Sequence, residues 1–253
     1  MGSIKAIGFD LFNTLIMAGP GAVGVALTRL TDNLRTGGLD LDPERFQTVY
    51  RQAAVRFIKE AHREGKETHN RFWISAALTE MGHPLSPEDA RVTAAVEAYF
   101  SAFFAFCRLI PGTDEMLAGL KGNYRLGLLS NFTHPPAARG LLDYFGLTPF
   151  FEVVLISGDL GYRKPHLSVF EQLISELGVE RDQILFIGDD LEPDIRGAKE
   201  AGLNPVWMTY VRDNHVPTFP GYTKDQEQEA DPDVPRISHW QDLLNLLDGA
   251  PHL

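Results

Sequence analysis

The sequence predicts an α/β fold, a doubly wound parallel sheet whose core is interrupted by an inserted block of helices. Three observations lead to this prediction. Five short apolar runs have the length and character of buried strands. Amphipathic helical segments separate the later runs, which is typical of repeating strand-helix units. Over a hundred residues of helical character lie between the first run and the second.

The expected strands are all short and apolar. They are Ile4–Phe9, Arg125–Leu129, Val153–Ile156, Ile184–Ile187 and Pro205–Thr209. In a doubly wound sheet, functional side chains gather beyond the carboxyl ends of such strands. The residues that follow each run are therefore the first candidates for a functional site.

The expected helices between the later strands have recognisable ends. Ser168–Leu177 is followed by Gly178, the residue type that most readily closes a helix in the left-handed conformation. Asp194–Ala201 is followed in the same way by Gly202. A last amphipathic helix is expected over Trp240–Leu247.

The long segment between the first two strands predicts helices of its own. Asp42 and Pro43 have the pattern of an N-cap and first helical position. Ser86 resembles a second helix start, with Asp89 at the capping-box position. Apolar residues recur at helical spacing after both starts, which indicates a small core. The expected division is a core of residues 1–16 and 109–253 and a helical insert of residues 17–108.

Composition narrows the class of protein. A hydrophobic fraction of 44% fits a soluble globular protein, and a net charge of −11 disfavours nucleic acid and anionic membranes as partners. Cys107 is the only cysteine, so no intramolecular disulfide or cysteine-based zinc site is possible. No secretory signal or membrane span is present, and we expect a cytoplasmic protein. Phe104 and Phe106 fall outside the apolar stripe of the insert and could form a dimer surface, so the expected oligomeric state is a monomer or a homodimer.

Polar residues follow four of the expected strands. In chain order they are Asp10, then Ser130 and Asn131, then Lys164, then Asp189, Asp190 and Asp194. Each one alone is a common turn, cap or surface residue. Because the carboxyl ends of parallel strands meet at one edge of the sheet, we expect these side chains to converge. The prediction of a site depends on the whole set.

The carboxylates in this set suit phosphoryl transfer with a metal ion. Asp10 can attack phosphorus and form an aspartyl-phosphate, which divides one difficult displacement into two. Two anions repel each other unless their charge is offset, and Mg²⁺ bound by Asp10 and Asp189 would do so. Asp190 or Asp194 could orient metal-bound water.

The remaining members can bind the transferring group. Lys164 offers a compact positive charge beside Asp10 and the phosphoryl group. The hydroxyl of Ser130 can donate a hydrogen bond to a phosphate oxygen, and nearby backbone N–H groups can add further bonds. The expected partner is therefore a small phosphorylated molecule.

The chain resembles the haloacid dehalogenase-like hydrolase superfamily over nearly its whole length. The matching motifs are Asp10–Thr14, Ser130-Asn131, Lys164-Pro165 and Gly188-Asp189 with Asp194. The resemblance implies a Rossmann-like catalytic core with a helical cap between the first and second motifs. The insert of residues 17–108 lies at the place of that cap.

The resemblance also implies roles for single residues. Asp10 is expected to be the nucleophile, with Mg²⁺ held by Asp10, the backbone carbonyl of Phe12 and Asp189, and we add Asp194 to this metal group. Ser130, Asn131 and Lys164 are expected to take part in catalysis beside Asp10. Four residues are expected to bind the substrate: Thr14, Ser130, Asn131 and Lys164.

Position 12 departs from the phosphatase pattern of this superfamily. Phosphatases usually carry an Asp two residues after the nucleophile as general acid and base, whereas this chain carries Phe12. The loss of such a group typically lowers the rate by about 100- to 10,000-fold. His134, a residue of the cap or water could provide the proton instead, or a good leaving group could depart without one.

Two other functions stay open at this point. Haloacid dehalogenases of the superfamily carry Tyr at the position of Phe12 and a Ser-Asn second motif, and the halide they release needs no proton. They work without metal, however, whereas the acidic pair Asp189 and Asp194 asks for a cation. The other alternative is a metal-binding regulatory protein that has lost turnover. A Mg²⁺-dependent phosphatase is the function that the acidic residues favour.

Overall fold

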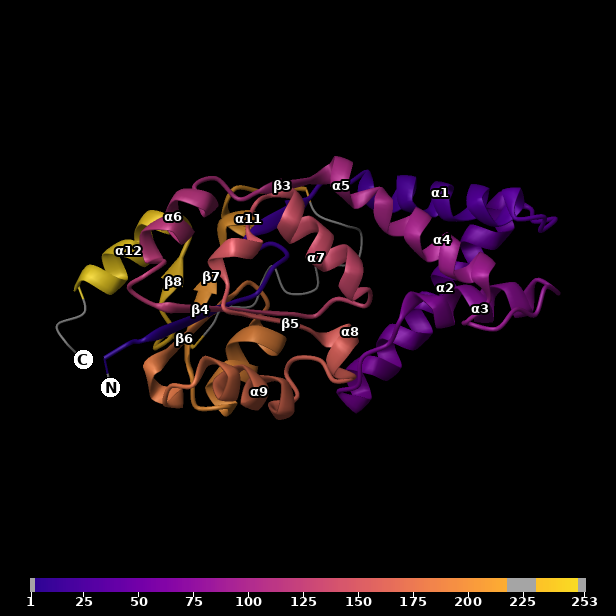
Figure 1. Ribbon diagram of the computed structural model, residues 1–253. Helices are drawn as coiled ribbons and strands as arrows, with labels where there is room; N and C mark the ends of the chain where they lie inside the picture. The colour runs from indigo at the N-terminus through magenta and orange to yellow at the C-terminus, as the bar shows by residue number, and fades with distance from the viewer. Residues whose placement is uncertain (1–2, 218–230, 250–253) are drawn as a thin grey trace.

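The computed structural model describes residues 3–217 and 231–249. Its centre is a six-stranded sheet in the order β5-β4-β1-β6-β7-β8, with each strand parallel to its neighbours (Figure 1). The strands are β1 (Ala6–Phe9), β4 (Arg125–Ser130), β5 (Val153–Ile156), β6 (Ile184–Gly188), β7 (Asn204–Met208) and β8 (Arg236–Ile237). After β1 the chain adds β4 and β5 on one side of it and then β6, β7 and β8 on the other side. The direction of winding therefore changes at β1. Ligands of doubly wound sheets bind at such a point.

Helices cover both faces of this sheet (Figure 1). Side chains of β1 alternate between the faces, so that Ile7 and Phe9 enter one apolar core and Ala6 enters the other. The first core includes residues of α6 (Thr113–Leu120), α7 (Pro135–Tyr144) and α12 (Trp240–Gly249). The second includes residues of α9 (Leu167–Leu177) and α10 (Gly197–Glu200). The remaining elements around the sheet are α8 (Ser157–Leu160), α11 (Tyr210–Asp213), the 3-10 helices η1 (Thr148–Phe150) and η2 (Arg181–Gln183), and the π-helical turn η3 (Leu191–Arg196). The expected Rossmann-like core is confirmed.

Most of the segment between β1 and β4, residues 22–101, forms a separate group of helices beside the sheet (Figure 1). We call α1 to α4 with their connections the helical insert. Its helices are α1 (Ala22–Thr36), α2 (Pro43–Glu64), α3 (Asn70–Glu80) and α4 (Ala90–Ser101), followed by the short α5 (Phe103–Phe106). The antiparallel strands β2 (Ile16–Ala18) and β3 (Cys107–Leu109) join it to the core, with Met17 opposite Arg108. The first apolar core continues from the sheet into these helices.

Local signals placed most helix ends correctly. The side chain of Asp42 caps α2 by accepting a hydrogen bond from Arg45 N at 2.8 Å. Gly178 ends α9 with φ of 61°. Asp89, however, does not occupy a capping-box position inside a helix. It is itself the N-cap of α4, because Ser86 belongs to a separate turn whose hydroxyl accepts from Glu88 N.

The helix expected over residues 194–201 also begins elsewhere. Asp190 is the N-cap of η3, since its side chain accepts a hydrogen bond from Glu192 N, and η3 then continues directly into α10. The turn after β6 is consequently helical three residues earlier than the periodicity predicts, which brings Asp194 inside a helical turn.

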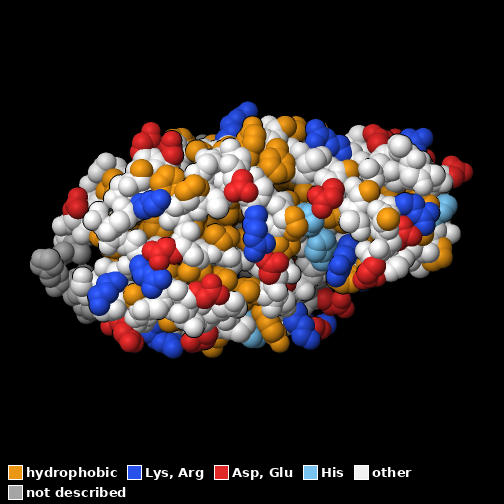
Figure 2. All heavy atoms as spheres, viewed as in Figure 1, with side chains coloured by type: hydrophobic (Ala, Val, Ile, Leu, Met, Phe, Trp, Pro, Cys, Tyr) orange, Lys and Arg blue, Asp and Glu red, His pale blue; other side chains and the backbone are white. Residues whose placement is uncertain are grey.

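Two further features of the described residues concern the charge of the surface and the character of the helices. Acidic and basic side chains are interspersed over the face of the molecule shown in Figure 2. No helix within residues 3–217 and 231–249 combines the length and the apolar character that crossing a membrane requires.

Candidate active site

Asp10 stands directly beyond the central strand β1. Its backbone N–H donates to Ile187 O at 2.8 Å, which extends the pairing of β1 with β6 by one residue. The chain then turns sharply, with Asn13 in the left-handed region at φ 57° and Asn13 N donating to Ile16 O. Asn tolerates this conformation better than most residues with a side chain. The turn leaves the Asp10 side chain at the carboxyl edge of the sheet, with Thr14 Oγ1 at 3.4 Å from its Oδ2.

Lys164 lies between two carboxylates. Its Nζ is 2.7 Å from Asp10 Oδ1 and 2.7 Å from Asp194 Oδ1, and the residue is only 2% exposed. Burial alone would lower the pKa of this ammonium, but the charges of Asp10 and Asp194 outweigh that effect and raise it. The side chain is therefore a fixed positive charge at the edge of the sheet.

Asn131 fixes the backbone of Lys164 from the neighbouring strand end. Its Oδ1 accepts from Lys164 N at 2.8 Å, and its Nδ2 donates to Lys164 O at 3.0 Å. Both polar atoms of the amide are thus used to hold the chain at Lys164. Ser130, the last residue of β4, is 1% exposed at the same edge.

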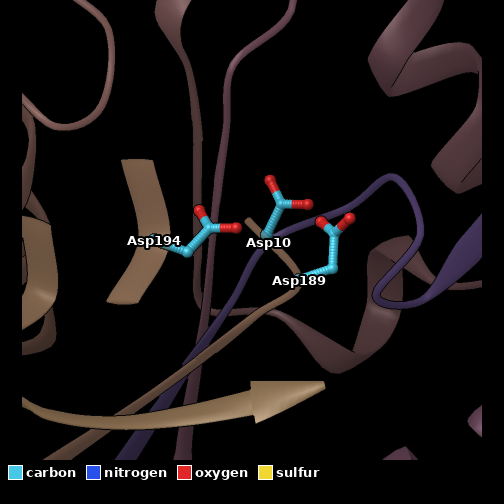
Figure 3. A group of neighbouring side chains, drawn as sticks. All are labelled: Asp10, Asp189 and Asp194. Atoms are coloured by element: carbon cyan, nitrogen blue, oxygen red, sulfur yellow. The ribbon is translucent and has the colours of Figure 1, made fainter. Parts of the chain in front are cut away.

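Asp189 and Asp194 come from the end of β6 and from η3. Each can place one carboxylate oxygen within 4.8 Å of the others and of one from Asp10. Figure 3 shows the three carboxyl groups turned toward a common point. Asp194 Oδ2 also accepts a hydrogen bond from Asp190 N at 3.0 Å. A Cβ on Gly188 would lie 2.4 Å from the Asp194 side chain, so the approach of Asp194 to β6 requires glycine there.

The charges in this cluster do not balance. Burial raises the pKa of Asp10 to about 7, with Asp194 adding to the rise and Lys164 opposing it. Burial together with the charges of Asp10 and Asp194 raises the pKa of Asp189 well above its ordinary value. Asp189 Oδ1 is buried and has no hydrogen-bond partner among the described residues. One ammonium therefore faces three carboxylates, and a bound cation would supply both the missing charge and the missing partner.

The donor atoms fit a hard divalent cation. They are carboxylate oxygens, the ligand type that Mg²⁺ and Ca²⁺ prefer. The three carboxylates lie close enough to share one ion. The role expected for the carbonyl of Phe12 stays a prediction.

The side chain of Phe12 belongs to an aromatic cluster between the core and the insert. Its ring stacks on Phe132 with centroids 5.0 Å apart and an interplanar angle of 7°. It also meets Phe103 edge-on at 6.4 Å. Position 12 is thus used for packing, and it offers no proton to a substrate.

His134 is buried at the start of α7 and is held by two residues of the insert. Arg71 N donates to His69 Nδ1, so neutral His69 carries its proton on Nε2. That Nε2 lies 3.1 Å from His134 Nδ1, which must then accept, and His134 Nε2 donates to Glu97 Oε1 at 3.1 Å. Burial lowers the pKa of both histidines, to about 4 for His69. Histidine side chains are visible where the insert meets the core in Figure 2.

Because both ring nitrogens of His134 take part in these hydrogen bonds, neither is available to protonate the leaving group of a substrate. The histidine instead connects the insert to the core, and His69 and Glu97 are the residues that hold it. No sequence pattern singles out His69 or Glu97, because each reaches the core only through the folding of the insert.

The sequence is similar to known hydrolases along most of its length. The family model described as haloacid dehalogenase-like hydrolase matches residues 4–202. A glyceraldehyde 3-phosphate phosphatase from Pyrococcus abyssi is 32% identical over 208 residues, which cover 82% of each protein. A ribulose-1,5-bisphosphate 5-phosphatase from Halopiger xanaduensis is 28% identical over 95% of this chain and 99% of its own length.

Solved structures share the fold. A phosphatase from Thermococcus onnurineus aligns with a TM-score of 0.62 and 25% identity, over 97% of this chain and 99% of its own. A 2-haloacid dehalogenase from Pseudomonas syringae aligns with a TM-score of 0.69 and 20% identity over the same shares. Because both kinds of enzyme have this fold, the fold does not decide between their reactions.

Proposed function

The chain belongs to the haloacid dehalogenase-like hydrolase family, and we propose that it hydrolyses small phosphorylated metabolites with Asp10 as the nucleophile. The relatives that act on glyceraldehyde 3-phosphate and ribulose 1,5-bisphosphate support a phosphoric monoester hydrolase. They also support a small phosphorylated molecule as the substrate.

The ion pairs of Lys164 carry this proposal. The ammonium lies 2.7 Å from both Asp10 and Asp194, and Asp189 completes a group of three neighbouring carboxylates. This arrangement suits a substrate that arrives with strong negative charge and a cation. A free haloacid would bring a further carboxylate beside three others without such a cation. The acidic group therefore supports phosphate ester hydrolysis over dehalogenation.

The reaction that we assign to these residues has two displacements. A carboxylate oxygen of Asp10 attacks phosphorus, the bond from phosphorus to the ester oxygen breaks, and the departing oxygen takes a proton from water, because position 12 supplies none. A second water molecule then attacks the phosphorus and gives a proton to the solvent, phosphate leaves, and the carboxylate of Asp10 is restored. Lys164 orients Asp10 throughout and offsets its charge, and Asn131 holds Lys164 in position.

The cation that we assign to the site is Mg²⁺, held by Asp10, Asp189, Asp194 and the carbonyl of Phe12. When bound, it would offset the negative charge of the phosphoryl oxygens. Thr14 lies beside Asp10, and Ser130 is the last residue of β4. We assign both residues to binding of the phosphoryl group.

The net charge of −11 supports a small molecule rather than nucleic acid as partner. We further propose a cytoplasmic enzyme that acts as a monomer or homodimer.

Dehalogenation of a short 2-haloacid is the second candidate. The aromatic Phe12 and the Ser130-Asn131 pair favour it, since a departing halide needs no proton from position 12. It predicts halide release that persists in EDTA.

One assay separates the two candidates. We expect phosphate release from glyceraldehyde 3-phosphate or a similar ester in Mg²⁺, loss of that activity in EDTA, and its loss in Asp10→Asn. Asp182→Asn, an exposed carboxylate of η2, is the matched control and should keep full activity. Halide release from 2-chloropropionate in EDTA, without any phosphate release, would replace the proposal by the second candidate.

A further inference from the structure

The helical insert touches the core at a second place besides the β2-β3 ribbon. After α2, Gly65 O accepts from Arg163 N at 3.0 Å, and Glu67 N donates to Gly161 O at 2.9 Å. Lys66 and Tyr162 form an antiparallel bridge between these two bonds. The end of α2 lies beside α8 in Figure 1. The insert is therefore paired, backbone to backbone, with the residues that immediately precede Lys164.

Glu67 adds a buried side chain to this contact. Its Oε2 accepts from Ser157 Oγ at 2.5 Å, and its Oε1 accepts from Thr68 N at 2.8 Å. Arg163 lies 3.4 Å from the same Oε1. The Glu67 side chain is 2% exposed, so these bonds are shielded from water.

Ser157 and Arg163, the two core residues that contact Glu67, each connect it to active-site residues. Ser157 Oγ accepts from Phe132 N at 2.8 Å, which holds the loop that carries Ser130 and Asn131. Arg163 precedes Lys164 in the chain, and Asn131 in turn holds the backbone of Lys164. Through Ser157 and Arg163, the carboxylate of Glu67 thus contacts both the residue that holds the loop after β4 and the residue that precedes Lys164.

We propose that Glu67 is a positioning residue, which fixes the Ser130–Phe132 loop and Lys164 in working geometry when the insert is seated on the core. This inference rests on the proposed phosphatase activity. Without Glu67, the hydroxyl of Ser157 and the guanidinium of Arg163 lose a buried acceptor and take new arrangements. Small displacements of supporting residues are costly for catalysis, because the reacting groups must be aligned within a fraction of an ångström.

The test compares Glu67→Ala with the wild type under saturating Mg²⁺. We expect kcat to fall by about 10- to 100-fold, and KM to stay within about threefold of the wild-type value, since the phosphoryl ligands themselves are retained. Glu67→Gln keeps the volume and one acceptor oxygen, and it should recover most of the lost kcat. Glu64→Ala, an exposed neighbour that pairs only with Arg63 and Lys66 among the described residues, is the matched control.

Ser157→Ala completes the test and also serves if Glu67→Ala does not fold. It removes one hydroxyl with little change in volume, and we expect a fall in kcat of the same kind. Because both residues act through one contact, the double variant should lose little more than the more damaging single variant. An unchanged kcat, a change confined to KM, or fully additive losses would overturn the inference. A wild-type protein without phosphatase activity would instead overturn the proposed function.

Discussion

At the scale of single residues, Lys164 connects the groups that we assign to the reaction. Its ammonium is buried between Asp10 and Asp194, and the amide of Asn131 holds its backbone on both sides. A mobile surface lysine could reach the same carboxylates only at a larger loss of side-chain entropy. The structure thus provides Asp10 with a partner whose position is fixed before the substrate arrives.

Phe12 stands where the phosphatase pattern of the family would place a proton-transferring aspartate. It lies in an aromatic stack with Phe132 and cannot donate a proton. His134 does not replace it, since both of its ring nitrogens are bound to the insert. Substrates that need protonation of the departing oxygen should therefore react more slowly than those that do not.

Phe12→Asp should change this selectivity. A carboxyl group two residues after Asp10 can protonate an alkoxide, whereas an aryl oxide departs without help. We expect the ratio of kcat for glycerol phosphate to kcat for nitrophenyl phosphate to rise by at least about 10-fold. Phe12→Asn, which removes the ring but cannot transfer a proton, is the control and should leave the ratio unchanged. An equal change on both substrates would show that leaving-group protonation is not what position 12 limits.

At the scale of elements, the turn from β6 into η3 places the acidic pair. Asp189 ends the strand region, and the early start of the helical turn returns Asp194 against Gly188. Asp190 serves this turn at both ends, because its N–H binds Asp194 and its side chain caps η3. The spacing of the acidic residues is therefore a property of one turn, independent of the helical insert.

Gly188→Ala tests this element directly. A methyl group at position 188 would lie 2.4 Å from the Asp194 side chain and must displace it from Lys164. We expect phosphatase activity to fall by more than about 10-fold, together with weaker Mg²⁺ binding in a calorimetric titration. Gly119→Ala, where a Cβ meets nothing within 4 Å, is the matched control and should keep both. Full activity in Gly188→Ala would mean that Asp194 is not needed where the structure places it.

The same elements show how far the sequence leads. The strands β1, β4, β5, β6 and β7 lie within a few residues of their predicted positions, because each is an apolar run bounded by turn residues. Asp10, Ser130 and Asp189 could be predicted because they lie at or just after the ends of those runs, whereas Lys164 comes only after α8 and Asp194 lies inside η3. The strands β2, β3 and β8 were not expected, since segments of two or three residues show no periodicity. The N-cap role of Asp89 was missed because Ser86 imitates a helix start.

At the scale of the whole molecule, the site depends on contacts between distant parts of the chain. Glu67 meets Ser157 across 90 positions, and His69 meets His134 across 65. Such pairs leave no local pattern in the sequence. The sequence therefore predicts the helical insert and its position in the chain, but not the residues through which the insert contacts the core. The boundaries at residues 17 and 108 stay a prediction, although the two residues face each other in the β2-β3 ribbon.

The distribution of charge belongs to the same scale. The protein carries a net charge of −11, yet its proposed substrate is an anion. Attraction must come from the site itself, through Lys164 and the cation that the three carboxylates would hold. Removal of Mg²⁺ should consequently weaken substrate binding as well as turnover. Loss of phosphate release in EDTA measures the effect on turnover, and a calorimetric titration with inorganic phosphate, with and without EDTA, measures the effect on binding.

The central claim is that Asp10 carries the phosphoryl group during turnover, and trapping that species tests it most directly. The protein is mixed with Mg²⁺ and a phosphorylated substrate, stopped in acid within the first turnover, and examined by intact mass and peptide mapping. The predicted result is the added mass of one phosphoryl group on the peptide that contains Asp10, absent from Asp10→Asn. Rapid phosphate release with no labelled peptide, or with the label on another residue, would contradict the claim.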